Sequence, residues 1–350
     1  MKRIRAHHPE AIALGLFDAF SHATGHKIGD SDSADAFMAS IRVAINNAAG
    51  SPILIHGQRA EKMFGFVVAS LQGCKLVREE DAGEIYANDP TLHVPDYRLV
   101  LKSGESVFVE VKNCNAEGPD ESLQFRQDYV DGLERYGGIF GLPVKIAVYW
   151  ARWRLWTLIS TTNLGFENGK RTLNLLGAIK KNEMAKLGDF MIGTKPPLTM
   201  RLVADRSKGR VIREEKRGQR EVGFTIADIE FFCDRVKVID EKEKALAFYL
   251  IMFGDWKQED PCGVFEGEEL TGIDFTCTPE EFDPAQGFAM IGYASSMISN
   301  VLGDLTVDAG EVERLTPKGD PGSFGILIDP GYKGIHLPLW RFHMEPGKDE

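Results

Sequence analysis

The segment PDYRLVLKSGESVFVEVK, residues 95–112, constrains the fold of this chain most, because it predicts a β-hairpin with ionisable side chains at one end. Residues 97–102 and 106–112 are rich in β-branched and aromatic residues, and both alternate with a period of two, as adjacent strands do. If Lys102, Ser103 and Gly104 form a three-residue loop between them, Gly104 takes the left-handed conformation that such loops favour. This loop sets a register in which Asp96 lies opposite Glu110.

The two faces of the predicted hairpin differ in character. Side chains alternate in direction along a strand, so Lys112 shares the face of Glu110, while the valines within 107–111 point the other way into a core. Phe108 also lies on the face of Glu110, so this face is not simply solvated. Charges beside apolar groups need partners or a metal. This favours a functional site. The alternative is that Glu110 and Lys112 form a surface ion pair and that Asp96 caps a turn.

Length and cysteine usage predict the class of protein. A chain of 350 residues exceeds the usual size of one domain, so we expect two. Its five cysteines form no C-x-x-C pair, which argues against a disulfide framework and a structural zinc site and fits a reducing cytoplasm. The opening segment is a poor signal peptide, and no apolar run approaches the length of a membrane span. We therefore expect a cytoplasmic protein with no membrane contact.

Charge is spread unevenly along the chain. Residues 145–220 carry 17 Lys and Arg against 6 Asp and Glu, whereas residues 1–144 and 221–350 are both net negative. Only a docking surface needs to be positive to bind a polyanion, so this pattern suits a local contact with nucleic acid. A solvated basic helix and hairpin would give the same count, and charge alone leaves the two interpretations even.

Helices and strands are predicted on both sides of the hairpin. Before it, residues 58–72 show a helical apolar pattern, with Glu61 on its flank, and residues 75–86 show a strand pattern. After it, residues 121–136 are predicted as a helix that ends at Gly137-Gly138, and Gln127 lies on its apolar side. A glutamine facing inward needs partners, so it is either a satisfied core amide or part of the same site as Asp96. Two apolar strands, 144–150 and 153–159, follow.

This order, helix, strand, strand, strand, helix, strand, together with Pro95-Asp96 and Glu110-x-Lys112, resembles the PD-(D/E)xK nuclease superfamily. The resemblance covers about residues 52–160. It implies an α/β fold with a restriction-endonuclease-like core, α-β-β-β-α-β. It also implies a Mg²⁺-dependent nuclease that hydrolyses phosphodiester bonds, with DNA as the expected substrate and Mn²⁺ as a substitute ion.

The same resemblance implies roles for individual residues. Asp96 and Glu110 would bind the metal, with Val111 and Glu61 as further ligands, and Lys112 would orient or activate the attacking water. Glu61 matches an additional acid on the first helix of many family members, and Gln127 a glutamine on the second helix of some. A catalytically inactive nuclease-like binding module and an RNA-directed nuclease remain alternatives.

The remainder of the chain shows no motif that we recognise. We expect an N-terminal helical segment over 1–50, with helices near 10–23 and 34–48, a nuclease-like domain over 51–193, and an α+β C-terminal domain over 194–350. Further predicted elements follow the two apolar strands: helices over 176–193, 241–253 and 288–302, a hairpin or arm over 201–220, and strands over 325–330 and 334–342. The acidic end of the chain suits self-association or a protein partner, since its charge repels phosphates.

Overall fold

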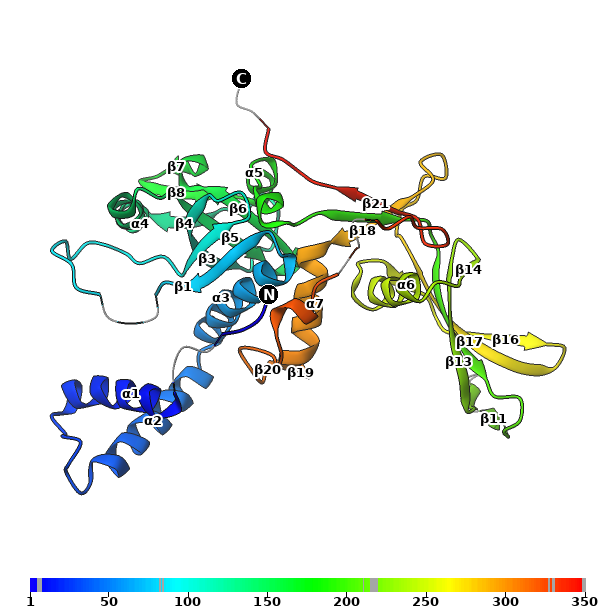
Figure 1. Ribbon diagram of the computed structural model, residues 1–350, viewed down its shortest axis with the longest axis horizontal. Coiled ribbons are helices and arrows are strands. Elements are labelled where there is room, and N and C mark those ends of the chain that lie inside the picture. Colours follow the sequence, from blue (N-terminus) through cyan, green and yellow to red (C-terminus); the bar gives the residue numbers. More distant parts are fainter. Residues whose placement is uncertain are drawn as a thin grey trace.

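The computed structural model describes residues 1–4, 8–81, 83, 85–209, 211–214, 220–326, 328 and 331–347, and the side chains of 211–214 and 220 are not described. Within these residues the fold is mixed α/β, with several separate sheets (Figure 1). No described helix is both long enough and apolar enough to cross a membrane.

The helices of the described chain include long ones at the start and shorter ones later. Their bounds are α1 Pro9–Thr24, α2 Ser33–Ala49, α3 Pro52–Leu71, α4 Gln127–Phe140, α5 Leu175–Lys180, α6 Glu241–Phe253 and α7 Ala294–Thr306. The predicted positions of α1, α2 and α6 are confirmed. In Figure 1, α1 and α2 lie beyond the N-terminal end of α3, away from the sheets.

The central sheet has five strands in the order β1-β2-β3-β5-β6. Their bounds are β1 Cys74–Glu79, β2 Tyr97–Leu101, β3 Ser106–Cys114, β5 Val144–Trp150 and β6 Leu155–Ser160. The pair β3 and β5 is parallel, and the other neighbours are antiparallel. A parallel pair needs a long crossover connection, and here it contains α4. The predicted strand over 144–150 is confirmed to the residue.

Two hydrophobic cores sandwich this sheet. On one face, α3 and α7 pack over Val107, Val109 and Val111, and Trp156 donates a hydrogen bond of 2.9 Å to Ser299 of α7. On the other face, α4 packs over Phe108 through Leu133 and neighbouring aromatic residues. The sheet is therefore buried on both faces, and its ionisable groups sit between apolar layers.

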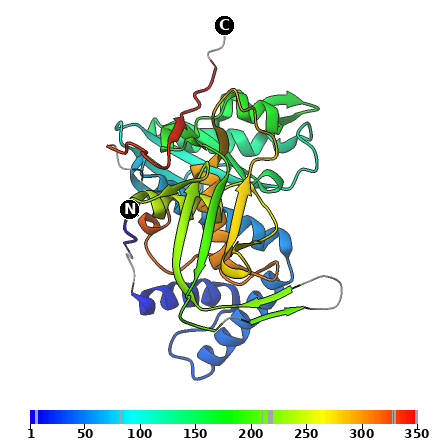
Figure 2. The same ribbon diagram turned by 90° about the vertical axis from the view of Figure 1, so that its right-hand side faces the viewer.

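The remaining strands form smaller sheets and one larger one. The larger sheet has the order β14-β13-β10-β17-β15, with β16 also pairing with β17. It extends away from the central sheet in Figure 1, and its strands face the viewer in Figure 2. Its strands are β10 Leu198–Ala204, β13 Ile226–Cys233, β14 Val236–Val238, β15 Lys257–Gln258, β16 Cys262–Glu266 and β17 Glu269–Thr278. The others are β4 Leu123–Arg126, β7 Gly165–Glu167, β8 Lys170–Leu173, β9 Met191–Thr194, β11 Val211–Glu214, β12 Arg220–Gly223, β18 Ala289–Tyr293, β19 Val307–Asp308, β20 Glu311–Val312 and β21 Leu339–Phe342.

Several predicted elements were wrong in extent or type. The helix predicted over 121–136 begins only at Gln127, because residues 123–126 form β4, which pairs with β8, and it continues past Gly137-Gly138 to Phe140. The helix predicted over 176–193 is interrupted, since α5 ends at Lys180, a 3₁₀ turn follows, and residues 191–194 form β9.

Other differences lie near the ends of elements. The strand predicted over 75–86 ends at Glu79, and residues 82 and 84 lie outside the described residues. The helix predicted over 288–302 starts as β18, because residues 289–293 pair with β9. The described part of 325–330 contains no strand, and of 334–342 only the last four residues do.

Candidate active site

The β2–β3 hairpin has the predicted register. Tyr97 pairs with Val109 and Leu99 with Val107, and Gly104 in the connecting loop has a positive φ of 101°. A positive φ favours glycine, because a Cβ would be strained there. Asp96, which directly precedes β2, therefore lies beside Glu110, just beyond the last residue pair.

Asp96 is held by main-chain groups from two strands. Its Oδ2 accepts a hydrogen bond of 2.6 Å from the N–H of Val111, and its main-chain oxygen accepts one of 2.8 Å from the N–H of Glu80. Pro95 before it is buried. The Val111 N–H thus holds the Asp96 carboxylate against β3, which is the strand that carries Glu110 and Lys112.

Glu110 is a buried carboxylate, only 2% exposed. Its Oε1 accepts hydrogen bonds from the Nζ of Lys112 and from the hydroxyl of Tyr129 in α4. Its Oε2 is buried and has no hydrogen-bond partner within the described chain. Leaving a buried carboxylate oxygen unpaired costs free energy, so this atom is placed to accept a ligand that the described residues do not supply.

Lys112 completes a three-membered network with Glu110 and Tyr129. Its Nζ also donates to the Tyr129 hydroxyl at 3.2 Å and lies 5.2 Å from the centre of the ring. Burial is the largest single effect and opposes the charge of this lysine, but Glu110, Tyr129 and Asp96 together outweigh burial and raise the pKa of Lys112. Lys112 is therefore a positive charge at neutral pH, next to two carboxylates.

The two carboxylates influence each other. Burial and then repulsion by Glu110 raise the pKa of Asp96 to about 8, while the hydrogen bond from Val111 opposes this rise. A pair of close carboxylates in a buried setting favours the uptake of a positive charge, either a proton or a cation. This electrostatic arrangement is common at functional sites.

Glu61 approaches the same group from α3. Burial raises the pKa of its carboxyl, Lys112 lowers it, and Glu110 raises it again, so the charges of the three side chains interact. Gln58 donates a hydrogen bond of 2.9 Å to its Oε2, and the Tyr97 hydroxyl donates one of 2.9 Å to its main-chain oxygen. The structure thus places Glu61 near the hairpin group rather than in open solvent.

Gln127 has a different environment from the other candidates. It is the first residue of α4, and its Nε2 donates a hydrogen bond of 2.6 Å to Asp131 one turn later. Within the described residues no hydrogen bond joins it to Asp96, Glu110 or Lys112. The helical face on which it was predicted does not exist at this point, because residues 123–126 form a strand.

Tyr129 is the residue that sequence reasoning did not identify. It lies on the first turn of α4, where its hydroxyl meets Glu110 and its ring packs 4.7 Å from the ring of His93. With a helix assumed from residue 121, this position had no distinct signal. Once α4 is known to begin at Gln127, the first turn of the crossover helix faces the strand that carries Glu110.

The donor set suits a hard divalent ion. Three carboxylates, Asp96, Glu110 and Glu61, provide oxygen ligands of the kind that Mg²⁺ prefers, and the Glu110 Oε2 lacks a partner. The described residues contain no group of three or more His, Cys, Asp or Glu side chains arranged to hold a metal ion. One oxygen of Glu110 is taken by Lys112, so a bound ion requires a local rearrangement of these side chains.

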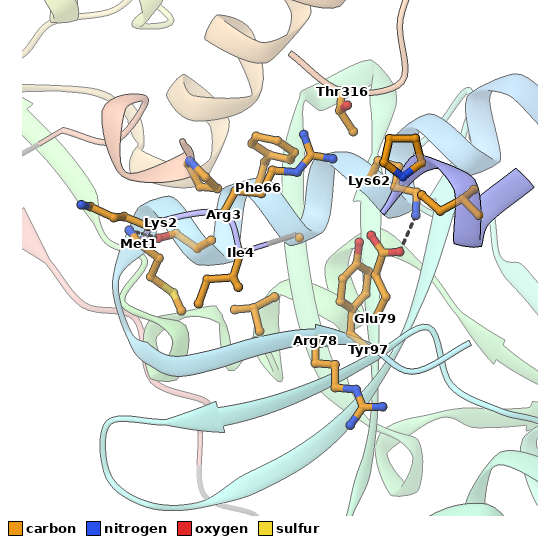
Figure 3. Close-up of a pocket in the computed structure, with 16 residues that line it drawn as sticks. Met1, Lys2, Arg3, Ile4, Lys62, Phe66, Arg78, Glu79, Tyr97 and Thr316 are labelled. Carbon is orange, nitrogen blue, oxygen red and sulfur yellow. Dashed lines mark hydrogen bonds and ion pairs between the residues drawn. The ribbon is translucent and has the colours of Figure 1, made fainter. Parts of the chain in front are cut away.

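A separate pocket lies elsewhere in the described structure (Figure 3). It has a volume of about 910 Å³ and lies between residues 1–4, α3 and β1, and the Lys62–Glu79 ion pair of 2.7 Å crosses one wall. Tyr97 is part of its lining, next to Asp96 in sequence. None of the candidate site residues is among the described residues that line this pocket, so it is separate from the candidate active site.

Comparison with protein-family models and with curated proteins finds no match to this chain. Among solved structures, the chain is similar to Hjc, a Holliday junction resolvase from the archaeal hyperthermophile Archaeoglobus fulgidus. The similarity covers 32% of this chain and 84% of the resolvase, at 18% sequence identity and a TM-score of 0.26. We therefore base the function on the geometry of the site alone.

Proposed function

We propose that this chain is a Mg²⁺-dependent nuclease that hydrolyses phosphodiester bonds, with DNA as its substrate. The observation that carries the proposal is the group formed by Asp96, Glu110 and Lys112, in which a buried oxygen of Glu110 has no partner within the described chain. Two acids and a lysine on neighbouring strands are the residue types that metal-assisted phosphodiester hydrolysis requires.

The surrounding elements support a PD-(D/E)xK type of core. Along the chain, α3, β1, β2, β3, α4 and β5 follow in the order expected from that resemblance, with the short β4 added before α4. β3 lies at the centre of the sheet, antiparallel to β2 and parallel to β5. The candidate residues come from α3, β3 and the segment just before β2, which this order brings together.

We propose that Asp96 and Glu110 hold the metal ion, with Val111 and Glu61 as further ligands. Val111 would contribute its main-chain oxygen, and the N–H of the same residue donates to Asp96, so both residues lie at one point of the site. When bound, Mg²⁺ would lower the pKa of a water molecule and neutralise charge on the phosphate, while usually keeping several waters of its own. Mn²⁺ serves as a substitute.

The chain's own residues then position the reactants. Lys112 brings a positive charge and a proton donor beside the carboxylates and does not itself coordinate the ion, so it suits orientation of the attacking water and stabilisation of the phosphate. Tyr129 keeps Lys112 and Glu110 in place through its hydroxyl. The apolar layers on both sides of the sheet limit access of bulk water to these charges, which strengthens their interactions.

We propose that the basic stretch 145–220 contributes to nucleic-acid binding, but through only part of its residues. Lys145 is buried and paired with Glu183, and Arg201 forms a two-pronged ion pair with Asp274. Residues 210 and 215–219 lie outside the described residues. The exposed side chains of Lys180 and Lys208 are better placed to meet phosphates.

We also propose the domain division at residues 50 and 193, although several elements cross it. Strand β9 spans residue 193 and pairs with β18 and β21 of the later part. Helix α7 belongs to the later part of the chain, and its Ile298 and Leu302 pack in the same core as α3. The acidic residues of 221–350 suit contact with a second copy or a protein partner, because their charge repels nucleic acid.

The test of this function is a cleavage assay with the purified chain. Plasmid, linear duplex, single-stranded DNA and RNA are incubated with Mg²⁺, with Mn²⁺ and with a chelator. We expect cleavage of DNA that depends on the ion. Preferential cleavage of RNA would show that RNA, not DNA, is the substrate. Binding of nucleic acid without cleavage of any substrate would favour an inactive binding module.

A further inference from the structure

A small pocket lies where α3 meets the carboxyl ends of β3 and β5. Its volume is about 240 Å³, below the range of typical pockets for drug-sized ligands. His56 and Arg59 of α3 line one side, Asn113 and Asn115 line the end of β3, and Tyr149 and Arg154 complete it. Two of the strands involved, β3 and β5, are parallel neighbours, and Asn113 pairs with Tyr149.

The lining of this pocket is polar and basic. It contains two arginines, a histidine and two side-chain amides, and none of its described lining residues is acidic. Arg154 is close enough to Asp255 for their charges to interact, but no ion pair joins them in the described structure. Guanidinium groups and amides together are donors suited to a small oxyanion.

Arg59 has an unmet hydrogen-bonding requirement. Its Nε is buried and has no hydrogen-bond partner, and no described carboxylate forms an ion pair with it. A partly buried guanidinium is stabilised by an acidic partner, since burial of an unpaired charge costs free energy. The described residues supply no such partner, so the site can accept a negative group from a ligand.

The pocket lies at the carboxyl end of β3, on the opposite face of the strand from Glu110 and Lys112. Asn113 directly follows Lys112 in β3, and the alternation of side chains places it on the face of the sheet that α3 covers. Arg59 lies two residues before Glu61, whose charge interacts with those of Lys112 and Glu110. The same helix thus borders both the pocket and the carboxylate group.

We propose that this pocket binds a phosphate group of the nucleic-acid strand, next to the phosphate that is cut. This inference rests on the proposed nuclease function and adds a second point of contact with the same strand. Arg59 and Arg154 supply the positive charge, and Asn113 and Asn115 supply neutral donors. The small volume suits a phosphate with part of its sugar rather than a stacked base.

The test uses Glu110→Gln protein, which prevents cleavage, with Arg154→Ala as the principal variant. Arg59→Lys is a second variant, checked for folding by circular dichroism, because Arg59 also borders a small cavity of about 10 Å³ beneath α7. Arg152→Ala is the matched control, since Arg152 is exposed on the same turn and does not line the pocket. The probes are inorganic phosphate and single strands of about ten nucleotides with a 5′-phosphate, a 3′-phosphate or neither.

We expect inorganic phosphate to raise the melting temperature of the control but not of Arg154→Ala. We also expect Arg154→Ala to weaken strand binding by about tenfold relative to the control, the loss typical of a charge-assisted hydrogen bond. A preference for one phosphorylated end would assign a terminal phosphate to the pocket. Equal binding of all three strands, with the same dependence on Arg154, would assign an internal phosphate.

Two results separate the pocket from the catalytic proposal. If Arg154→Ala and folded Arg59→Lys bind phosphate and strands as tightly as Arg152→Ala, the pocket assignment is wrong, whether or not the parent protein cleaves DNA. If the parent fails to cleave any substrate while phosphate binding still depends on Arg154, the pocket is upheld as an anion site and the nuclease function is wrong.

Discussion

The Oδ2 of Asp96 accepts a hydrogen bond of 2.6 Å from the main-chain N–H of Val111, which ties the residue before β2 to the centre of β3. This bond brings Asp96 beside Glu110, and the repulsion between the two carboxylates adds to burial in raising the pKa of Asp96 to about 8. The folded protein is therefore more stable when a proton or a bound cation neutralises the Asp96 carboxylate.

The first prediction concerns stability without metal. The folded-state pKa of Asp96 is raised above its unfolded value, so its contribution to stability is fully present below about pH 4 and is lost as pH rises towards 8. In a chelator, Asp96→Asn should be more stable than the parent at pH 8.5 by on the order of 2 kcal/mol, and the difference should shrink towards pH 5. Thermal unfolding at several pH values measures this. A difference that does not change with pH would contradict the assignment.

The second prediction concerns the binding of Mg²⁺. Because a carboxylate must lose its proton to bind a metal ion, the affinity should increase with pH up to about 8 and then level off. The increase should approach about tenfold per pH unit if one proton is released. Calorimetric titration with Mg²⁺ or Mn²⁺ measures the affinity, and buffers with different ionisation enthalpies count the protons. An affinity that is constant between pH 6 and 8 would argue against Asp96 as a ligand.

The third prediction assigns a positioning role to Tyr129. Tyr129→Phe removes the hydroxyl that contacts Glu110 and Lys112, and we expect it to slow cleavage by about tenfold or more, as loss of a partner of a metal ligand does. It should also reduce metal affinity. Tyr136→Phe is the matched control, because Tyr136 lies on the same helix and its hydroxyl contacts Glu80. Equal rates for the two variants would rule out this role.

The fourth prediction separates basic residues that face solvent from those that are already paired. Alanine at both Lys180 and Lys208 should reduce the slope of log affinity against log salt by up to about 2 for duplex DNA, if each touches one phosphate. Arg201→Gln should leave the slope nearly unchanged, because Asp274 occupies its guanidinium. Fluorescence anisotropy at several salt concentrations measures both slopes. A larger change for Arg201→Gln would show that the ion pair opens to bind DNA.

Local sequence patterns predicted the hairpin well because its structure is set by neighbouring residues. The loop at Gly104 and the alternation of the two strands determine the register of β2 and β3, and these signals lie within one short segment. The element order around the hairpin followed from periodicity in the same way. These local patterns alone predict that Asp96, Glu110 and Lys112 lie together, without any information on tertiary contacts.

The features that sequence patterns missed depend on distant partners. Residues 123–126 are extended because they pair with 170–173, and residues 289–293 because they pair with 191–194. Neither partner is close in sequence, so local propensity alone favoured helices at these places. Because α4 begins at Gln127 and not near residue 121, Gln127 does not lie on the helical face predicted for it. For the same reason the sequence pattern did not indicate Tyr129, whose contact with Glu110 exists only in the folded chain.

The central claim is tested most directly by the rate of DNA cleavage in Mg²⁺ by Glu110→Gln and Lys112→Ala, compared with Glu105→Gln in the loop of the same hairpin. Glu105 is exposed, so its substitution controls for a change of charge in this segment. We predict that the parent and Glu105→Gln cleave at similar rates and only with the ion present. The other two variants should fold normally and cleave about a hundredfold more slowly or not at all. Cleavage by folded Glu110→Gln and Lys112→Ala at the rate of the parent would contradict the account.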